Sequence, residues 1–561
     1  MSVYTTKILS ERIPKSSSIL YVPPEKPLSD IDLIKEITID GNLNKTQKRD
    51  LENIIIKHRT IFDPTLPGYN HAFGPVYASF SFASKARPVA AKIRTPNYGS
   101  CQDVLFNQKC QSLKQLGVLI DPVEHGIQPR MTHNSWVVKK PSAANKPWDK
   151  CSMKDTRLVV GLDPLNKFLA DPPGKVTKTE AIYAALANWE FMGELDFSDF
   201  YFQIKFRSNT DADRQKLGYL RIRTATGTMC FSSATMGLLG MDVFQDELTD
   251  KVLGDLVLSG NVVKLADNIY FGSNSLQDFV KVFSTILGRC EAANLRLKPG
   301  KLKLNIQQAD ILGLNWNKGR ISPSRHKLDP LAECQPPTTV SGLRSWLGSV
   351  RFNEVCLPGT KLAEFTKPLD EQIPASRSGK ESVTWTPELL TPFKKIQEIL
   401  KAPLSVVIPK RGDSTFLAVD ACTSLPAGGS KLFIQRPGVN GFLPSFNFGC
   451  RLPNTVKPWS PCEVEAFFLN KGLEKSEFYT KLTGNPGVVL TDCKPVYQAK
   501  QKLDKGQFSS NKRLQSLLNN ILAKRYSIQL LSAKLPSSLL KLVDFGSRNP
   551  VECKVKVKVY C

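Results

Sequence analysis

The sequence lacks the features that identify secreted or zinc-stabilised domains. Its 13 cysteines are an odd number without any C-x-x-C pair, and only five histidines accompany them. This pattern argues against a disulfide framework and against structural zinc. No window approaches the roughly 18 uncharged apolar residues of a membrane helix, and the stretch MSVYTTKILSERIPK has no apolar core of signal-peptide length. We therefore expect no membrane partner and a reducing compartment, the cytoplasm, the nucleus or both, rather than secretion.

Acidic residues are also scarce relative to basic ones. The chain has 51 Asp and Glu against 76 Lys and Arg, which gives a formal net charge of +25 at pH 7 and a pI near 9.5. Solubility does not require such an excess, so it favours a polyanionic partner, nucleic acid before membrane, although basic ribosomal, matrix and structural proteins share it. From Lys494 onward there are 14 Lys or Arg against three acids, and a hybrid duplex passing over this part would meet its phosphates there.

Length and composition predict several folded units. The 561 residues exceed what one core can organise, which suggests three or four structural units. Hydrophobic residues make up 41% of the chain and include seven Trp and 29 Phe, so the chain can offset the entropy of ordering. A largely disordered protein is therefore excluded.

Hydrophobic periodicity outlines the order of elements. The first half predicts a helix in LNKTQKRDLENIIIKHRTIF, strands in SWVVKK and TRLVVGL separated by a loop, and a helix in MDVFQDELTDKVLGDLVLS. Helical patterns follow in TVSGLRSWLGSVRFNEVCL and ELLTPFKKIQEILKA, and the polar linker EQIPASRSGKES between them is the best candidate for a boundary between lobes. After it come three strands (STFLAVDA, GGSKLFIQ, SFNFGCRL), a helix from Pro461, a strand in GVVLTD and further helices. That order predicts an α/β unit.

Two aspartates lie at the ends of strand-like runs about 70 residues apart. Asp196 lies in GELDFSDFYFQIKF and Asp267 in KLADNIYFGS. Neighbouring strands that bring two carboxylates to one sheet edge can hold two divalent ions and align a hydroxyl with a phosphate. Either aspartate alone is more commonly a strand-end residue facing solvent.

The context of both aspartates resembles reverse transcriptases. LDFSDFYFQI is similar to the first catalytic motif of that family, and LADN stands where the family has its Tyr-x-Asp-Asp turn. The resemblance implies that Asp196 and Asp267 are ligands of Mg²⁺ or Mn²⁺, with Asp199 beside them. It places Tyr201 where the family has the aromatic residue that rejects a ribose 2′-hydroxyl. Asn268 replaces the second aspartate of the turn, and this removes one negative charge beside two dications.

Other landmarks of the family follow in the right order. SWVVKK and TRLVVGLDPLNK look like the fingers, which implies that Lys140 and Arg157 grip the incoming triphosphate and that Asn166 closes the motif. MGLLGMDVFQ, from Met236 to Gln245, is similar to the glycine-leading helix, without the usual proline and one residue short. ILGLNWNKGRISPSRHKL resembles the strand pair that steadies the primer end. PPTTVSGLRSWLGSVRFNEVCLPG resembles the thumb of long-terminal-repeat retrotransposons of the gypsy and BEL/Pao kinds.

A second set of acids follows the linker. These acids, each at the end of a strand or in a helix, are Asp420 in FLAVDA, Glu465 in SPCEVEAFF, Asp492 in VVLTDCK and Asp544 in LVDFGSRNP. Their order and spacing look like a ribonuclease H core, which implies that the four carboxylates hold two metal ions at one phosphate. Glu463 competes with Glu465, but E-A-F-F-L fits the family pattern better from the second glutamate. Taken singly, each of the four is more commonly a surface acid.

The resemblance implies an α+β fold, a right-hand polymerase followed by an α/β ribonuclease H-like domain. We expect an N-terminal extension with the start of the fingers, fingers and palm, a thumb, a connection, a ribonuclease H-like domain and a basic tail. Their boundaries are 1–95, 96–322, 323–380, 381–410, 411–552 and 553–561. The implied function is an RNA-directed DNA polymerase and ribonuclease H that copies retroelement RNA into DNA. Its partners would be an RNA template, a DNA primer, the RNA–DNA hybrid and dNTPs, and its oligomeric state stays open.

Two alternatives remain beside this enzyme. Asn268 favours a catalytically impaired, retroelement-derived protein that binds nucleic acid without polymerising, whereas the full set of ribonuclease H acids favours the enzyme. The other alternative, an integrase-type core at the end of the chain, needs no acid in the helix between its first two aspartates. Glu465 lies between Asp420 and Asp492 and argues against it.

Overall fold

The computed structural model places most of the chain between residues 22 and 530. It describes residues 22, 25–84, 88, 100–172, 179–224, 227–265, 268–311, 313–357, 359–374, 376, 378–422, 427–451, 459–523 and 527–530. Asp267 and Asp544 lie outside these ranges, and for Asp420 the backbone alone is described. The fold divides into two compact units, Met1–Thr177 with Phe191–Ile306, and Lys178–Glu190 with Gln307–Cys561.

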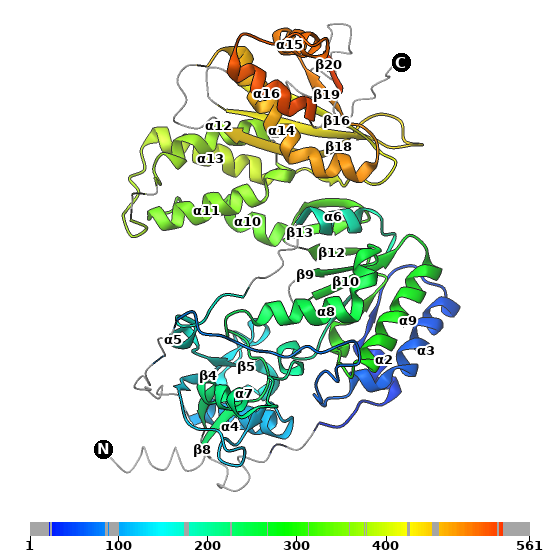
Figure 1. The fold of residues 1–561 in the computed structure, drawn as a ribbon, viewed down its shortest axis with the longest axis vertical. Coiled ribbons are helices and arrows are strands. Elements are labelled where there is room, and N and C mark those ends of the chain that lie inside the picture. Colours follow the sequence, from blue (N-terminus) through cyan, green and yellow to red (C-terminus); the bar gives the residue numbers. More distant parts are fainter. Residues whose placement is uncertain are drawn as a thin grey trace. The chain divides into compact units, whose positions relative to one another are not determined.

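A five-stranded sheet is the centre of unit 1 (Figure 1). Its order is β1 (Thr38–Ile39), β11 (Lys303–Leu304), β6 (Phe191–Asp196), β10 (Asn268–Ser273) and β9 (Val262–Leu265). The helices α8 (Met241–Leu258) and α9 (Leu276–Ala292) pack on it. We call this layer the palm. Gly193 in β6 makes the packing possible, because a Cβ there would stand 2.3 Å from the ring of Phe271, which stacks on Phe279 and Phe283 of α9.

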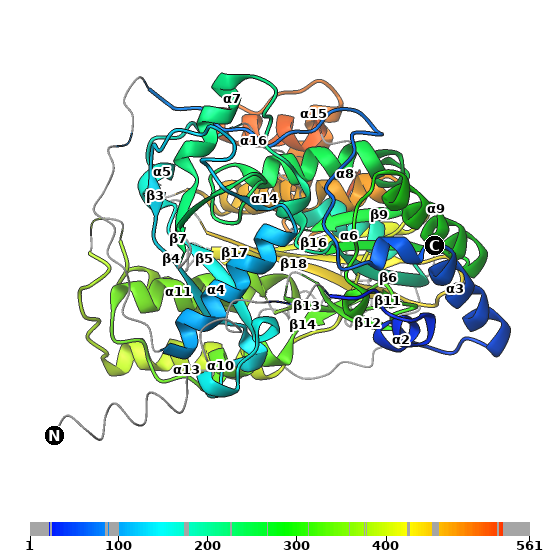
Figure 2. The same cartoon turned by 90° about the horizontal axis from the view of Figure 1, so that it is seen from below.

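The N-terminal segment is part of the palm layer. α2 (Asp30–Glu36) and α3 (Lys45–Lys57) lie beside the palm strands, and β1 between them pairs in parallel with β11 (Figure 2). His58 Nδ1 lies 2.7 Å from Glu291 Oε2 at the end of α9. The capping box of Asn44 and Gln47 starts α3, as its polar N-terminus and apolar periodicity predict.

The rest of unit 1 carries the expected finger strands. β4 (Ser135–Lys139) and β5 (Thr156–Val160) form an antiparallel pair, and the insertion between them contains three short 3₁₀ turns. Beside this pair lies a four-stranded sheet in the order β2 (Leu119–Ile120), β8 (Gly227–Phe231), β7 (Arg221–Thr224), β3 (Thr132–His133). α4 (Ser100–Gln115) packs on β4 and β2.

Unit 2 contains two sheets and a group of helices. The first sheet has the order β12 (Gln308–Ile311), β13 (Leu314–Asn317), β14 (Arg320–Pro323), β15 (Val406–Val407). The helices are α6 (Thr179–Ala187), α10 (Arg325–Glu333), α11 (Val340–Phe352), α12 (Gly359–Asp370) and α13 (Pro387–Lys401). Trp346 of α11 and Trp385 pack on Phe393 of α13. The polar linker at 371–382, expected to be a boundary between lobes, lies between α12 and α13 inside this unit. The compact units divide instead after Thr177, after Glu190 and after Ile306.

The second sheet has the order β18 (Leu443–Arg451), β17 (Ala427–Gln435), β16 (Ser414–Cys422), β19 (Val488–Thr491), β20 (Ser527–Leu530). The first three strands are antiparallel, whereas β16, β19 and β20 run parallel. α14 (Pro461–Thr483) packs on β16 and on α16 (Lys512–Ala523), and α15 (Lys494–Asp504) follows β19. Gly472 brings α14 close to the sheet, because a Cβ there would stand 2.7 Å from Ser430 Oγ. The α/β unit predicted from the strand order is confirmed, with β20 as an additional strand.

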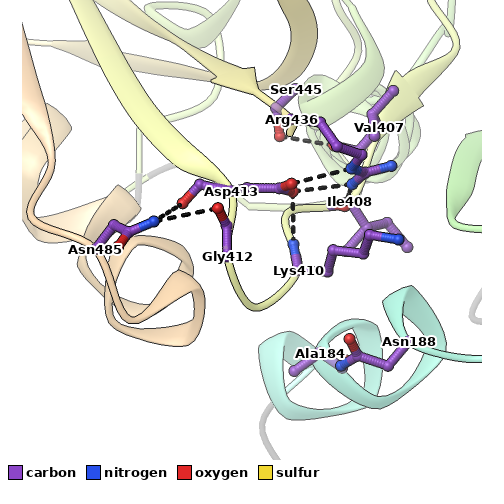
Figure 3. Close-up of polar contacts among 10 residues, drawn as sticks. All are labelled: Ala184, Asn188, Val407, Ile408, Lys410, Gly412, Asp413, Arg436, Ser445 and Asn485. Carbon is purple, nitrogen blue, oxygen red and sulfur yellow. Dashed lines mark hydrogen bonds and ion pairs between the residues drawn. The ribbon is translucent and has the colours of Figure 1, made fainter. Parts of the chain in front are cut away.

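A buried ion pair fixes the chain where it passes from the first sheet to the second (Figure 3). Asp413 is fully buried and accepts hydrogen bonds from Arg436 Nε at 3.0 Å, from Arg436 Nη2 at 2.9 Å and from the Lys410 backbone N–H at 2.9 Å. Arg436 also donates to the Ile408 carbonyl, and Asn485 donates to the Asp413 carbonyl. The strand pair β14–β15 is thereby tied to the start of β16.

Candidate active sites

Asp196 and Asn268 face each other at one end of the palm. They are direct partners in the antiparallel register of β6 and β10. Leu195 and Phe197 on either side of Asp196 are buried, so the alternation of the strand leaves the carboxylate half-exposed at the sheet edge. Asp267, which directly precedes Asn268 in the chain, lies outside the described residues. The two segments predicted to carry the first site are therefore brought together, and the position of the second carboxylate stays a prediction.

The turn after Asp196 is held by a buried glutamine that sequence analysis missed. Gln203 has no exposed surface, and its Nε2 donates to the carbonyls of Ser198 at 2.7 Å and Arg296 at 2.9 Å. Its Oε1 accepts from the Arg296 backbone N–H at 2.7 Å. This amide thus connects the turn to the segment around Arg296. Two residues later in that segment, the Lys298 N–H donates to the Asp196 carbonyl. Three bonds from one buried amide leave the turn little freedom.

Asp199 and Tyr201 occupy this turn. Asp199 has a left-handed backbone with φ of 42°, a conformation that few non-glycine residues adopt. Tyr201 lies in the short 3₁₀ turn Phe200–Gln203, half-buried against the palm core. The turn therefore presents one aromatic and one acidic side chain within five residues of Asp196.

Charged residues from several separate segments lie near Lys140. Burial lowers the pKa of Lys140, repulsion from Lys298, Lys109 and Arg157 lowers it further, and the charge of Asp199 acts in the opposite direction. Lys109 comes from α4, Lys140 and Arg157 from the β4–β5 pair, and Lys298 from the segment next to Asp196. The finger cations predicted to grip a triphosphate thus lie in the same neighbourhood as the end of β6. Such a cluster is a suitable place for an anion.

Asn166 connects the finger segment to the start of α8. Its Nδ2 donates to the Gly237 carbonyl at 2.8 Å, and its Oδ1 accepts from the Leu239 N–H at 3.1 Å. α8 begins at Met241, inside the stretch Met236 to Gln245 that resembled the glycine-leading helix. Asn166, which we predict to close the finger motif, therefore holds the backbone that leads into this helix.

The second site lies at the carboxyl edge of two parallel strands. β16 and β19 pair with Ala418 opposite Leu490, and Asp420 and Asp492 each come two residues later. This register puts both aspartates at the same edge of the sheet. Asp492 is exposed there. Asp544 lies outside the described residues, so its place at this edge stays a prediction.

The geometry separates the two glutamates of α14. Glu463 is the third residue of the helix and closes a capping box with Ser460, and its Oε1 accepts from Asn511 and Arg513. Hydrogen bonds from the Ser460 backbone lower the pKa of Glu463. Glu465 instead lies near the turn after β19. Burial raises the pKa of Cys493 in this turn to about 11, and the negative charges of Glu465 and Asp492 contribute to that rise. The preference for Glu465 at the second site is consistent with this arrangement.

Within the described ranges, no three His, Cys, Asp or Glu side chains are grouped so that they could hold a metal ion. Asp267, Asp544 and the side chain of Asp420 are outside that search. The helices of the described ranges include none long and apolar enough to cross a membrane.

Comparison with known proteins agrees with this architecture. No protein-family model matches the chain. Two polyproteins of Schizosaccharomyces pombe, those of the transposons Tf2-7 and Tf2-3, are each 23% identical over 343 residues, which is 60% of this chain and 24% of theirs. The chain thus spans about a quarter of the length of these curated relatives.

Solved structures of a foamy viral protease-reverse transcriptase are similar in fold. One in complex with double-stranded DNA has a TM-score of 0.71 at 17% identity and covers 91% of this chain and 99% of its own. Another, in complex with an RNA/DNA hybrid, has a TM-score of 0.65 at 16% identity and covers 96% and 67%. The expected architecture, a right-hand polymerase with a ribonuclease H-like domain, is confirmed by these matches. The chain therefore has the fold of a viral reverse transcriptase and is similar in sequence to transposon polyproteins, in agreement with the retroelement resemblance of its motifs.

Proposed function

We propose that this chain is an RNA-directed DNA polymerase joined to a ribonuclease H, which copies retroelement RNA into DNA and degrades the RNA of the resulting hybrid. The observation that carries the proposal is the register of β6 and β10, which sets Asp196 opposite Asn268, the residue after Asp267. In a fold of the polymerase kind, such a pairing would bring two metal-binding side chains to the site of nucleotide transfer.

Divalent cations fit the donor set of the first site. Carboxylates of Asp196 and Asp267, with the amide oxygen of Asn268, are hard oxygen ligands that suit Mg²⁺ or Mn²⁺ rather than zinc. Such ions, when bound, would activate the primer hydroxyl and neutralise charge on the transferred phosphate. Asp196 and Asp267 would hold them, and Asn268 would contribute one negative charge less than the aspartate it replaces.

The surrounding residues would bind and select the nucleotide. Lys140 and Arg157 would pair with the triphosphate, because their neighbourhood is rich in positive charge. Tyr201 would fill the space that a ribose 2′-hydroxyl needs. Gln203 and Asn166 would act through the backbone, by holding the turn after β6 and the start of α8.

The second site would cleave the RNA strand of an RNA–DNA hybrid. Asp420, Glu465, Asp492 and Asp544 are the proposed ligands of a second pair of divalent ions. The shared edge of β16 and β19 and the closeness of Glu465 to that turn support this assignment. A phosphodiester bound there would be attacked by a water molecule, which would cleave the RNA strand.

The remaining parts would guide the duplex. The hairpin β13–β14 would steady the primer end, and α11 would follow the sugar-phosphate backbone, because its exposed face combines small and basic residues. These are Ser341, Arg344, Ser345, Gly348 and Arg351. The boundaries 96–322, 323–380 and 411–552 for fingers and palm, thumb and ribonuclease H-like domain remain part of the proposal, as does a place in the cytoplasm or nucleus.

Primer extension tests the proposal directly. The purified chain is given poly(rA) with an oligo(dT) primer and dTTP, in Mg²⁺ and separately in Mn²⁺, and a parallel reaction follows cleavage of a labelled RNA–DNA hybrid. We expect both activities, with extension abolished by Asp196→Asn and hybrid cleavage retained in that variant. Folded protein that binds the hybrid but shows neither activity in either metal would overturn the proposal.

A second candidate is a nucleic-acid-binding protein that no longer polymerises. Asn268 is the observation that favours it, because the turn loses a charge that helps to retain two cations. This candidate predicts tight, salt-dependent hybrid binding that is unchanged by Asp196→Asn, with no extension by either protein.

A further inference from the structure

Lys264 and Asp246 form an ion pair between the palm sheet and α8. Lys264 lies in β9, three residues before Asp267 in the sequence, and Asp246 lies in the second turn of α8. The Lys264 ammonium donates a hydrogen bond to Asp246 Oδ1. The Lys264 side chain is 12% exposed and the Asp246 side chain 35% exposed. The pair is therefore partly shielded from water, and removal of Asp246 would leave a mostly buried ammonium without its counter-charge.

The strand register places Lys264 on the face of the palm sheet that the helices cover. Lys264 is the direct partner of Ile269 in β10, and direct partners share a face. Two residues after Ile269, Phe271 stacks on aromatic rings of α9. Side chains alternate along a strand, so Asn268 and its partner Asp196 belong to the opposite face. The ion pair thus holds the sheet from the side opposite the proposed metal ligands.

The helix that carries Asp246 is itself anchored at both ends. At its start, Asn166 of the finger segment accepts a hydrogen bond from the Leu239 N–H at 3.1 Å. Near its end, Asp255 accepts two hydrogen bonds from the guanidinium of Arg289 in α9. Asp246 therefore offers β9 a contact on a fixed element, and a shift of β9 away from α8 would break that contact.

We propose that Lys264 and Asp246 are a positioning pair, which holds β9 on α8 and thereby keeps Asn268 in register with Asp196. The consequence for metal binding rests on the proposed polymerase function, whereas the restraint on the strands does not. β9 is the last strand in the order of the palm sheet and pairs with β10 along one edge. An edge strand of four residues has few backbone bonds to hold it, so a side-chain contact with a helix adds a second restraint.

Lys264→Met removes the pair with the least disturbance. Methionine keeps the apolar part of the lysine side chain, and the Asp246 carboxylate that remains can be hydrated because it is the more exposed partner. Loss of one charged hydrogen bond should raise local opening of β9 and β10 by at least about fivefold. A displacement on the order of 1 Å at the reacting atoms can cost about 100-fold in rate, so kcat for extension should fall by at least about tenfold.

Hydrogen exchange tests the restraint independently of activity. The full chain is compared as wild type, as Lys264→Met and as Asp255→Asn, a control that breaks the other ion pair of α8. We expect faster exchange in Val262–Leu265 and Asn268–Ser273 for Lys264→Met and unchanged exchange in these strands for Asp255→Asn. Exchange in β9 and β10 that is the same for Lys264→Met as for wild type would overturn the proposal.

Primer extension tests the consequence for the site. In Lys264→Met we expect a lower kcat with the KM for primer–template unchanged, and Lys264→Arg, which keeps the charge, should restore most of the rate. A wild-type kcat in Lys264→Met would also overturn the positioning role. If exchange rises as expected but wild type itself extends no primer in Mg²⁺ or Mn²⁺, the restraint stands and the proposed polymerase function fails.

Discussion

Asn268 is the direct cross-strand partner of Asp196 in the antiparallel pair β10–β6. The residue that departs from the reverse-transcriptase motif is therefore the one that lies opposite the aspartate that we propose as the first metal ligand. Close opposition of two carboxylates is unfavourable without cations, and an amide opposite Asp196 removes that repulsion. If Asp196 and Asp267 are the metal ligands that we propose, this exchange should lower the affinity of the site for cations and reduce charge repulsion when no metal is bound.

Restoring the charge by Asn268→Asp is expected to raise DNA synthesis and to lower the Mg²⁺ concentration at half-maximal rate. Hybrid cleavage should stay unchanged, because the acids proposed for cleavage belong to the sheet that contains β16 and β19. Primer extension titrated with Mg²⁺ measures the effect, and Asn268→Ala serves as the control without an oxygen ligand. An extension rate in Asn268→Asp equal to that of wild type at all Mg²⁺ concentrations would contradict the role of the charge.

Replacing Tyr201 by valine is expected to admit ribonucleotides. The half-buried ring would no longer fill the space beside the turn, and discrimination against rNTPs should fall by at least about tenfold. Single-nucleotide incorporation with dTTP and UTP gives the ratio of kcat/KM values. Tyr201→Phe is the matched control and should discriminate like wild type. Unchanged selectivity of the valine variant would remove Tyr201 from the nucleotide site.

The two glutamates of α14 are expected to respond differently to substitution by glutamine. Glu465→Gln should remove hybrid cleavage with little change in stability. Glu463→Gln should retain cleavage and lose roughly 0.5–1 kcal/mol of stability, because the cap keeps an oxygen acceptor while the ion pair with Arg513 is lost. A loss of cleavage on Glu463→Gln comparable to that of Glu465→Gln would reverse the assignment.

The stability effect of Glu463 also has a pH dependence with a defined sign. Hydrogen bonding lowers the pKa of Glu463 in the folded protein, so its charged form stabilises the fold above the ordinary carboxyl pKa. This contribution is lost as the pH falls through the lowered pKa. The difference in Tm between wild type and Glu463→Gln should therefore be largest near neutral pH and shrink below about pH 4. A constant difference between pH 3 and pH 7 would rule out ionisation of Glu463 as its cause.

Breaking the buried pair of Asp413 and Arg436 is expected to destabilise unit 2 strongly. Asp413→Asn leaves a guanidinium among buried groups without its carboxylate, at a cost of about 3–5 kcal/mol. Glu398→Gln, which removes an exposed pair with Lys395, should cost less than about 1 kcal/mol. Hydrogen exchange in β16 and urea unfolding measure both variants. Equal losses in the free energy of unfolding for the two substitutions would show that the buried pair contributes no more to stability than an exposed one.

Asn166 is expected to act by positioning the start of α8. Asn166→Asp keeps an acceptor for the Leu239 N–H and loses the donor to Gly237, whereas Asn166→Leu loses both. Each lost bond is worth about 1 kcal/mol of stability, so Tm should fall by a few degrees, and the KM for dNTP should rise from wild type to aspartate to leucine because the start of α8 is held less firmly. An effect on Tm alone, without a change in KM, would make Asn166 a purely structural residue.

The sequence by itself determined the elements with local signals. The pattern S-P-C-E predicts the start of α14 at Pro461, since a serine cap, a proline in the first turn and a glutamate three residues after the cap act within one turn. Strand periodicity likewise predicted β4, β5 and the three antiparallel strands of the second sheet. Asp196, Asp420 and Asp492 could be assigned to the ends of strands from the sequence alone. Each follows an apolar run, and the end of such a run is visible in the local sequence.

Tertiary structure alone decided the contacts between distant segments. Gln203 reaches a carbonyl 93 residues away, and β1 pairs with β11 across most of unit 1. Neither contact has a signal in the local sequence, since a glutamine or a two-residue strand acquires its partner only when sheet register and helix packing are set. Register depends on the whole core, and it therefore decided which side chains meet at each site.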